Sequence, residues 1–492
     1  MAEATKTPIV HGGGEDDLLR RFGYKPQFQR VLGLFGDFSL GYSYMSPLAG
    51  FSALFAYALT TGGPRYFWTM PIVLFGQLMV SLVFAEASSQ YPIAGGVYQW
   101  ARRVGGPYWG FLTAWLYLLA LLGTNAGLAA GLSPFVASFL GVEAGPVFNA
   151  LVAVVVIIAA MLTNLGGTRI LGRATELGVW TGLAGLALLG VYLLLFGRVQ
   201  PLSVLNESFG AGADAPTFAW LSASLIGIWI FFGFEACGDL AEEVEDASTK
   251  VPRAMVLTML VGGLGTLVIA AGMTLAIPNI ADAVSGKDTN PVASVLQHAF
   301  GNIGTKIVLL ILIAVVYSAA VSIMASTSRL LFSLGRDRLI FGASALSTID
   351  EGRGLPVMAV IVSTIVPTLI LLVGIYSSDA LTNTISFATA GIYLSFQMVV
   401  AACLYARFNG WQPAGPFKLG ASGMIVTILA LIFGLGMVIN IAWPRPAADS
   451  SFLLTYLIPI SLVVIMITGL LQLSNVTAML RRNATSMQGA KV

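Results

Sequence analysis

Apolar residues along this chain are gathered into long runs that charged residues rarely interrupt. A helix needs about 20 apolar residues to cross a bilayer, and most of the runs reach that length. Inside lipid the backbone groups must bond within their own segment, so such runs form helices. The pattern predicts an all-α polytopic membrane protein with about 12 transmembrane helices. The expected spans are 31–60, 66–90, 108–140, 147–165, 174–197, 217–242, 252–277, 302–332, 356–376, 380–406, 420–443 and 452–475.

The composition agrees with a membrane protein. Of the 492 residues, 57% are apolar and 10% are charged, whereas soluble domains carry about 25% charged residues. The net charge of +2 gives no indication of a nucleic-acid partner. The two cysteines, Cys237 and Cys403, lie in apolar surroundings, so no disulfide framework is expected. Residues 1–30 are polar and lack an apolar stretch, which predicts a cytoplasmic N-terminal tail and no signal peptide.

Lysine and arginine indicate the orientation of the spans. If both termini are inside, 20 of the 25 Lys and Arg residues fall in segments on the inner side. Cytoplasmic loops are enriched in these residues. We therefore expect a multi-pass protein of the plasma (inner) membrane with both termini in the cytoplasm, and a second cytoplasmic tail at 476–492.

Two expected spans carry helix-breaking residues at mid-membrane depth. In the first, Pro47 removes a backbone hydrogen bond, close to Gly41 and Gly50. In the sixth, Glu235 follows Gly233. An ionisable residue at that depth costs about 2.5–3.5 kcal/mol on insertion scales, so it should face a cavity or a partner. The alternatives are a simple proline kink and a tilted helix with a polar end.

The two breaks lie five spans apart along the chain. That spacing predicts two five-helix repeats of inverted topology, at 31–197 and 217–406, which together form a ten-helix core at 31–406. In such a core the substrate lies between the two breaks, near the midplane. Helices 11 and 12, at 420–475, would then be an addition outside the repeats.

Two polar segments flank the spans. Residues 91–103 are expected to form a short amphipathic helix along the membrane interface, anchored by their aromatic residues. The acidic run at 242–246 is expected to be mostly a solvated turn. Asp239, Glu242 and Glu243 are also candidates for an inner gate with a basic partner such as Arg102 or Arg329.

Four elements of the sequence resemble those of the amino acid–polyamine–organocation (APC) superfamily of transporters. They are Y-P-I-A-G-G-V-Y-Q-W at 91–100, G-F-E-A-C-G-D-L-A-E-E at 233–243 with V-P-R-A-M at 251–255, S-R-L-L-F-S-L-G-R-D at 328–337, and G-P-F-K-L-G at 415–420. Each element is short, and their order along the chain carries the resemblance. The likeness is greatest to the amino acid/choline branch, which includes GABA and choline permeases.

The resemblance implies a five-plus-five inverted-repeat (LeuT-like) fold that works by alternating access, with a site between the breaks of helices 1 and 6 and flanked by helices 3, 8 and 10. It implies that Trp229 closes over the substrate and that Phe232 lines the pocket. It also implies a role for Glu235 in gating or proton coupling. The sequence departs from the family at 44–50, which has fewer glycines than a G-S-G break, and at 174–196, which lacks the lysine of some proton-coupled relatives.

Aromatic and polar side chains of five helices are the candidates for substrate binding. They are Tyr42, Tyr44, Met45 and Ser46 in helix 1, Trp115 and Asn125 in helix 3, Trp229, Phe232 and Glu235 in helix 6, Tyr317 in helix 8 and Tyr393 in helix 10. A cation over an aromatic ring gains about 0.5–2 kcal/mol, and helix N-termini at the breaks would hold a carboxylate. These features favour an amino acid or a small amine of the GABA, choline, ethanolamine or polyamine type.

Glu235, Asp239 and Trp229 are the candidates for coupling and gating. A protonated Glu235 would carry a coupling proton, and an ionised one would pair with a substrate amine. A third reading is a structural carboxyl bonded to the broken backbone. Ser318 and Ser322, four residues apart on one face of helix 8, are candidate sodium ligands.

The leading hypothesis is a secondary active transporter that imports an amino acid or small amine together with a proton. The alternatives are a substrate exchanger and a sodium-coupled symporter of the same fold. An enzyme is not expected, because the chain has no H-E-x-x-H or G-x-S-x-G motif and no Cys/His metal set, and a pump is not expected without a G-x-x-x-x-G-K-[ST] loop. We expect no cofactor, a lipid bilayer as surroundings, and a monomer or homodimer.

Overall fold

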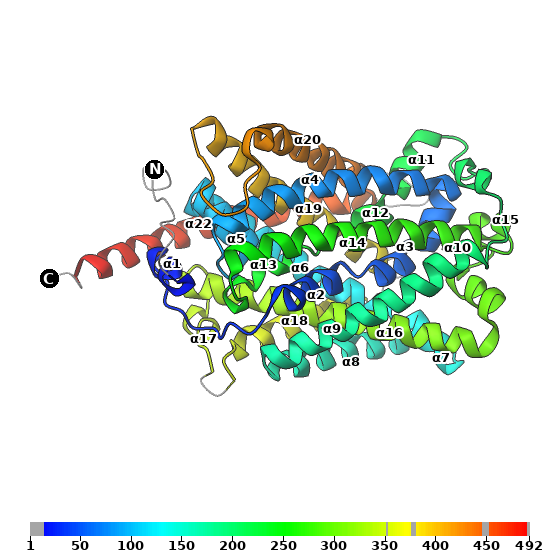
Figure 1. Ribbon diagram of the computed structural model, residues 1–492, viewed down its shortest axis with the longest axis horizontal. Coiled ribbons are helices and arrows are strands. Elements are labelled where there is room, and N and C mark those ends of the chain that lie inside the picture. Colours follow the sequence, from blue (N-terminus) through cyan, green and yellow to red (C-terminus); the bar gives the residue numbers. More distant parts are fainter. Residues whose placement is uncertain (1–13, 351–352, 375–379, 445–451, 490–492) are drawn as a thin grey trace.

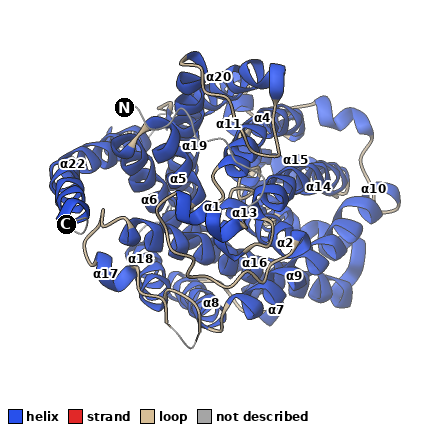
Figure 2. Cartoon of the chain, turned by 60° about the vertical axis from the view of Figure 1, so that its left-hand side comes forward, coloured by secondary structure: helices blue, strands red, loops and turns tan. Residues whose placement is uncertain are grey.

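The computed structural model describes residues 14–350, 353–374, 380–444 and 452–489 as helices joined by loops (Figures 1 and 2). Two isolated bridges, Leu32–Val244 and Asp350–Leu355, are the only β-pairing in those residues. The long helices run along one common axis. α1, α5, α13 and α17 lie at one end of the bundle, and α7, α11 and α15 at the other (Figure 1). We name these ends the α5 end and the α15 end.

The helices follow one another in the order that the apolar runs predict. In the first half they are α1 (Glu15–Arg21), α2 (Leu34–Met45), α3 (Pro47–Gly62), α4 (Thr69–Gln90), α5 (Gly96–Gly105), α6 (Pro107–Gly131), α7 (Ser133–Leu140), α8 (Pro146–Leu165), α9 (Thr168–Gly185), a π-helical turn η2 (Leu186–Tyr192) and α10 (Leu193–Leu195). In the second half they are α11 (Pro216–Ala223), α12 (Leu225–Ile230), α13 (Ala236–Asp239), α14 (Ala247–Leu275), α15 (Ile280–Ser285), α16 (Pro291–Arg336), α17 (Ala343–Leu346), α18 (Val357–Gly374), α19 (Ala380–Phe408), α20 (Gly423–Ala442), α21 (Phe452–Thr455) and α22 (Leu457–Gly489). Short 3₁₀ turns are η1 (Pro64–Trp68), η3 (Leu202–Asn206), η4 (Ala241–Glu243) and η5 (Gly420–Ser422).

The all-α polytopic fold expected from the sequence is confirmed. Among the described residues, nine helices are long and apolar enough to cross a membrane. The segments 216–230 and 457–473 are shorter apolar helices, and they fall in the sixth and twelfth expected spans. The first expected span is divided between α2 and α3. The eighth is longer than expected, because α16 also includes residues 291–300 before the kink at Gly301.

Both interruptions expected in the first and sixth spans are present. α2 ends at Ser46, which has a left-handed φ of 41°, and Pro47 then begins α3. Proline fits there because a residue in the first turn of a helix needs no intrahelical amide bond. In the sixth span the helix stops after Ile230 and resumes at Ala236, and Gly233 between them has a φ of 112°.

The packing of the spans has the symmetry that inverted repeats require. α6 packs along α19. Exchange of the two repeats replaces α6 by α16 and α19 by α9, and these two helices also pack along each other. The pairs α4 with α14 and α8 with α18 each join equivalent helices of the two halves. Exchange of the halves therefore maps the main contacts onto one another. The division into the two repeats at 31–197 and 217–406 remains a prediction, and this packing agrees with it.

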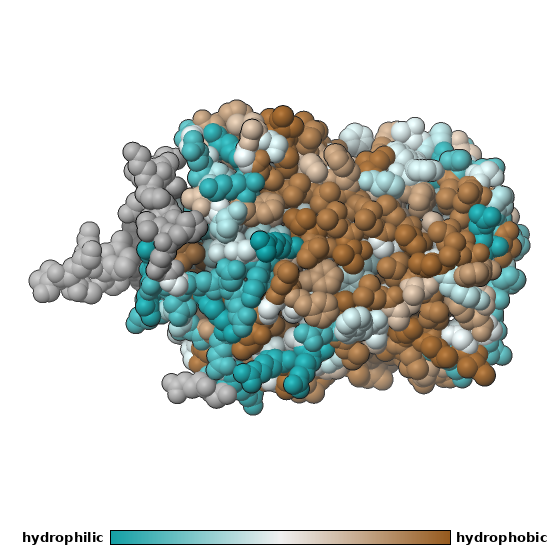
Figure 3. Space-filling model, viewed as in Figure 1, coloured by the Kyte–Doolittle hydropathy of each residue, from teal (hydrophilic) through white to brown (hydrophobic). Residues whose placement is uncertain are grey.

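A broad apolar belt covers the middle of the bundle on the face shown in Figure 3, and polar residues gather at its ends. Large exposed side chains such as Leu151 and Leu162 on α8 and Ile425 and Ile432 on α20 extend the same character to other helices. Such a belt matches the hydrocarbon core of a bilayer, which is about 30 Å thick. The protein is therefore a multi-pass membrane protein.

The G-P-F-K-L-G element lies against the last turns of α4, whose side chains accept hydrogen bonds from its backbone amides. The Gln90 side chain accepts the amides of Ala414 at 2.5 Å and Gly415 at 3.0 Å. The Ser89 hydroxyl accepts one amide of the 415–420 segment at 2.9 Å, and Glu86 accepts another at 2.8 Å. The element therefore ties the start of α20 to the second span through side chains that would otherwise be buried without partners.

Two sequence expectations about the polar segments are wrong. The 91–103 segment does form a helix, α5, but Tyr98 and Trp100 are fully buried within the protein and do not anchor it in the lipid interface. Glu242 and Glu243 are also buried, and only the later part of the acidic run is exposed. In both cases basic or aromatic partners from distant helices cover the segment.

Candidate functional site

The breaks of the first and sixth spans lie directly against each other. A Cβ on Gly233 would lie 2.5 Å from the amide nitrogen of Met45, so only glycine permits this approach. The Tyr44 and Phe232 rings meet edge to face with centroids 5.9 Å apart. The side chain of Met45 points to α14 instead, where a Cβ on Gly262 would lie 2.7 Å from its sulfur. Met45 therefore offers the region only its backbone.

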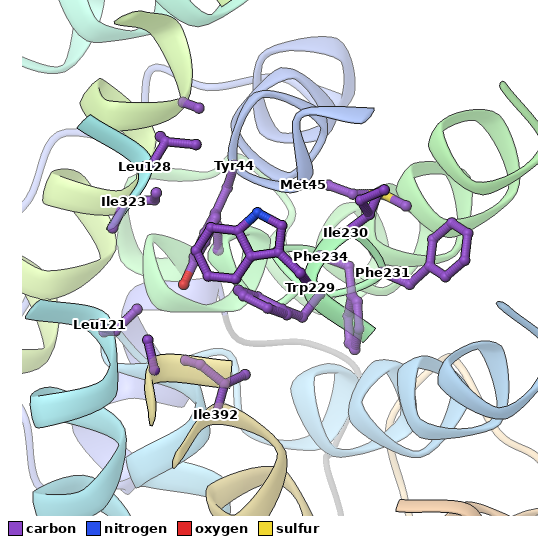
Figure 4. Packing of buried hydrophobic residues seen from close by; sticks show 14 of the residues in the cluster. Tyr44, Met45, Leu121, Leu128, Trp229, Ile230, Phe231, Phe234, Ile323 and Ile392 are labelled. Carbon is purple, nitrogen blue, oxygen red and sulfur yellow. The ribbon is translucent and has the colours of Figure 1, made fainter. Parts of the chain in front are cut away.

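Apolar side chains of the third, eighth and tenth spans surround the two breaks. Trp229 packs edge to face on Phe232, with ring centroids 5.6 Å apart. Around Trp229 and Tyr44, Figure 4 shows Leu121 and Leu128 of α6, Ile323 of α16 and Ile392 of α19. All of these side chains are buried. The surroundings are dry and largely apolar, so each polar group among them matters.

Two carboxylates face this region from the sixth span. Glu235 and Asp239 are one helical turn apart, and both are 0% exposed. The hydroxyl of Tyr117, on α6, lies 3.3 Å from Glu235 Oε1 and 3.0 Å from Asp239 Oδ2. The freed amide of Gly233 donates to Glu235 Oε2 at 2.7 Å. Within the described residues, no lysine or arginine pairs with either carboxylate.

Several other buried polar groups near the breaks lack hydrogen-bond partners in the described part of the chain. They are the hydroxyls of Tyr44 and Tyr393, Ser46 Oγ, both atoms of the Asn125 amide, and Asp239 Oδ1. Leaving such a group unpaired costs about 1–3 kcal/mol. Buried polar groups without partners are rare, and water or a bound ligand commonly supplies them. The region therefore offers donors and acceptors to a small polar molecule.

Besides Met45, three residues expected at the site point elsewhere. Trp115 donates its indole N–H to a threonine of α22 at 3.2 Å. Tyr317 is hydrogen-bonded to Thr163 of α8. Tyr42 faces α9, where a Cβ on Gly182 would lie 2.9 Å from its ring. The structure does not bring these three side chains to the breaks, because each has a partner on a helix outside them, and their role in binding remains a prediction.

Ser318 and Ser322 lie on one face of α16, as their spacing predicts, and both contact α2. Ser322 donates to the carbonyl of Leu40 at 2.7 Å, and Ser318 donates to Ser43 Oγ at 3.0 Å. A sodium ion between these atoms would have to replace those bonds. The serines are brought together with helix 1, and their role as sodium ligands remains a prediction.

Buried ion pairs close the α5 end below the two carboxylates. Arg329 of α16 forms two bonds with Glu243, of 2.7 and 3.1 Å, and both side chains are 1% exposed. Arg336 donates to Glu242 at 2.8 and 3.0 Å. Arg329 was expected as a partner for this acidic segment. Asp239, the first acidic residue of that segment, has no basic partner among the described residues.

The segment before α2 crosses the same end of the bundle. The Tyr24 hydroxyl donates to Asp337 at 3.0 Å and accepts a bond from Arg102 at 2.7 Å. Arg102 also pairs with Asp337. Arg30 donates to the carbonyl of Val244 at 3.1 Å. Residues 14–33 thus tie the start of α2 to the sixth and eighth spans, and the region between the breaks is closed on this side.

The sequence reasoning missed Tyr117 and chose Trp115 on the same helix. At about 100° per residue, the two lie about 80° to either side of Asn125 on a helical wheel. Periodicity therefore could not decide between them. A better signal would have been the hydroxyl, because a buried polar ring is the one that needs a polar partner.

A helical bundle in which two broken helices meet at buried carboxylates and unpaired polar groups has the architecture of a membrane transport protein. A family model described as amino acid permease matches residues 32–468. The chain belongs to this family, within the APC superfamily. The family resemblance found in the sequence is confirmed, and by its family the protein is a transporter and not an enzyme.

Curated relatives match nearly the whole chain at low identity. The chain is similar to the amino-acid permease BAT1 of Arabidopsis thaliana, with 24% identity over 84% of this chain and 86% of the relative. It is also similar to an uncharacterized amino-acid permease of Schizosaccharomyces pombe, with 24% identity over 87% and 78% of the two chains. A third relative is the thiamine transporter thi9 of the same yeast, with 22% identity over 90% and 83%.

Proposed function

We propose that this protein is a secondary active transporter that imports an amino acid or small amine by alternating access, driven by protons. The proposal is carried by two buried carboxylates, Glu235 and Asp239, which lie beside an aromatic cluster and have no lysine or arginine partner among the described residues. An ammonium group from the substrate would neutralise one of them, and a proton the other. The amino acid/choline branch, with substrates of the GABA, choline, ethanolamine or polyamine type, is the specific assignment that this chemistry supports.

The proposed binding residues are those that line the region between the breaks. They are Tyr44, Ser46, Tyr117, Asn125, Trp229, Phe232, Glu235, Asp239 and Tyr393. The substrate ammonium lies against the Tyr44 and Phe232 rings and bonds to Glu235 or Asp239. A cation over an aromatic face in a dry site gains about 2 kcal/mol. The hydroxyls and the Asn125 amide then hold the remaining polar groups of the substrate.

The proposed orientation places the α5 end in the cytoplasm of a plasma (inner) membrane. Most of the lysine and arginine residues lie in segments at this end, as the positive-inside rule requires. In the proposed cycle, the buried pairs at Glu242 and Glu243 break to release the substrate inward. A monomer or a homodimer is equally compatible with this cycle.

The substrate is identified by thermal-shift screening of the purified protein against amino acids, GABA, choline, ethanolamine and polyamines. A ligand that binds the folded state alone at 100 times its Kd stabilises it by about 2.7 kcal/mol, so a true substrate raises the melting temperature. Uptake of that compound into proteoliposomes is then measured against pH for the native chain and for Glu235→Gln. We expect the pH dependence to change in the variant. An unchanged pH dependence would remove Glu235 from proton coupling.

Two alternatives stay within the same fold. An exchanger would show counterflow of related solutes but no uphill uptake. A sodium symporter would lose uptake in sodium-free buffer. The hydroxyls of Ser318 and Ser322 already bond to α2, which favours the proton over sodium, because a sodium ion would have to displace those bonds.

A further inference from the structure

Asp37 is a buried acidic residue that the proposed site does not use. It lies in the first turn of α2 and is 0% exposed. Neither of its carboxylate oxygens has a hydrogen-bond partner in the part of the chain that the structure describes. A carboxyl group so placed is costly if ionised, so it must either hold a proton or bind a cation.

The surroundings of Asp37 come from the sixth and seventh spans. Gly41 follows one turn later on the same face of α2, and a Cβ there would lie 2.7 Å from both Cys237 Sγ and Thr258 Oγ1. The Cys237 thiol donates to the backbone carbonyl of Asp37 at 3.3 Å. The Thr258 hydroxyl is also fully buried and has no partner among the described residues. Two unpaired polar side chains thus share one seam between α2, α13 and α14.

Among the described residues, no lysine or arginine forms an ion pair with the Asp37 carboxyl. α13 contributes the Cys237 thiol and α14 the Thr258 hydroxyl. α9 contributes the half-buried Glu176, whose Oε1 lies 4.0 Å from where a Cβ on Gly36 would be. Arg329 of α16 is engaged in its own ion pair with Glu243. The helix N-terminus favours an anion at Asp37, but by far less than burial disfavours one.

A proton suits this seam better than a metal cation. Sodium is a hard ion that takes several oxygen ligands, whereas the unpaired side-chain groups of this seam are one carboxyl and one hydroxyl, and the thiol beside them is a soft ligand. A protonated carboxyl needs only one acceptor and brings no charge into the seam.

We propose that Asp37 is a second proton-binding site, in which the protonated carboxyl keeps α2 packed against α13 and α14. This inference rests on the proposed function, since it assigns a coupling proton to a residue outside the substrate site. The break at Ser46 separates α2 from α3, so α2 can move as a short rigid element. When the α5 end opens, water reaches the carboxyl, which loses its proton to the cytoplasm. The carboxylate regains a proton from the outer side when the α15 end opens, so that each cycle carries one proton inward.

The test compares two transport modes in proteoliposomes that hold an identified substrate. Uphill uptake driven by an imposed proton gradient requires a proton to bind and leave in each cycle. Counterflow at equal pH requires only that the loaded carrier reorients. The variants are Asp37→Asn, which keeps the shape of the protonated form, and Asp37→Glu, which restores an ionisable group. Asp214→Asn is the matched control, because Asp214 is exposed near the α15 end.

In Asp37→Asn we expect uphill uptake to fall by about tenfold or more while counterflow stays within about twofold of the native chain. Asp37→Glu should recover part of the uphill uptake, and Asp214→Asn should behave as the native chain. Undiminished uphill uptake in Asp37→Asn, or loss of both modes in folded Asp37→Asn and Asp37→Glu alike, would overturn the proposal. A sodium dependence that Asp37→Asn removes would overturn it too, by making the seam a sodium site. If the native chain exchanges substrate but shows no proton-driven uptake, then proton coupling by the whole protein is refuted, and the role of Asp37 is refuted with it.

Discussion

The buried pair of Arg329 and Glu243 should control the opening of the α5 end. Arg329→Met removes two bonds to Glu243, of 2.7 and 3.1 Å, and leaves that carboxylate with only the hydroxyl of Thr168. Removing one partner of a buried pair costs about 3–5 kcal/mol. The cost falls on the closed state, because an open α5 end would let water solvate Glu243. At 1.4 kcal/mol for each factor of ten, opening should become about 10² to 4 × 10³ times more frequent.

The native cysteines allow this opening to be measured. The chain has two, Cys237 and Cys403, and both are buried and free. In a Cys403→Ser background, Cys237 is the one remaining cysteine. It lies on α13, two residues before Asp239, between the proposed substrate site and the ion pairs at the α5 end. Its rate of reaction with a small thiol reagent follows the population of the open state when opening and closing are fast. We expect the rate to rise by about two orders of magnitude in Arg329→Met.

Two further variants separate the ion pair from a general effect of charge. Arg338→Met removes the same charge from an exposed position near the end of the same helix and should leave the rate unchanged. Adding Glu243→Gln to Arg329→Met removes the stranded charge and should lower the rate again, since neutral groups cost less to bury. If Cys237 reacts in Arg329→Met no faster than in Arg338→Met, while both are folded, the pair does not hold this end closed.

Three other substitutions test the contact between the two breaks, the substrate site, and the packing of the 415–420 segment on α4. Gly233→Ala should abolish uptake, because the new Cβ would lie 2.5 Å from an amide nitrogen of the opposite break and the φ of 112° is strained for alanine; normal uptake would show that the breaks do not meet in this way. Tyr117→Phe should weaken substrate binding by about tenfold, since the two carboxylates lose their shared donor, whereas Trp115→Phe should leave binding unchanged; a titration by thermal shift compares them. Gly415→Val should lower the free energy of unfolding by about 1–3 kcal/mol, because its Cβ would lie within 2.7 Å of α4 atoms, while Gly436→Ala, with open space around it, should not lower it; equal melting temperatures would contradict the close fit.

The spans and their breaks could be predicted because local chemistry decides them. A run of apolar residues must become a helix in lipid, and Pro47 and Gly233 weaken the helix locally because proline lacks an amide hydrogen and glycine has a flexible backbone. The position of Glu235 in a glycine-rich, otherwise apolar stretch was likewise visible in the sequence. These features need no knowledge of what packs against them.

Side-chain partners across helices could not be predicted in the same way. Glu242 was expected in a solvated turn because its neighbours in sequence are acidic, and its partner Arg336 lies on a helix far along the chain. Trp115 was proposed and Tyr117 was missed, and a helical wheel places the two equally far from Asn125. Asp37 drew no attention because one acidic residue near the end of a span usually reaches water, and its burial depends on α13 and α14.

The central claim is that the two broken helices form a proton-driven route for an amino acid or small amine. The most direct measurement is uptake of an identified substrate into proteoliposomes with an imposed inward proton gradient, in buffer without sodium. We expect accumulation above the external concentration that collapses when a proton ionophore is added. Uptake that never exceeds the external concentration, or that needs sodium, would contradict it.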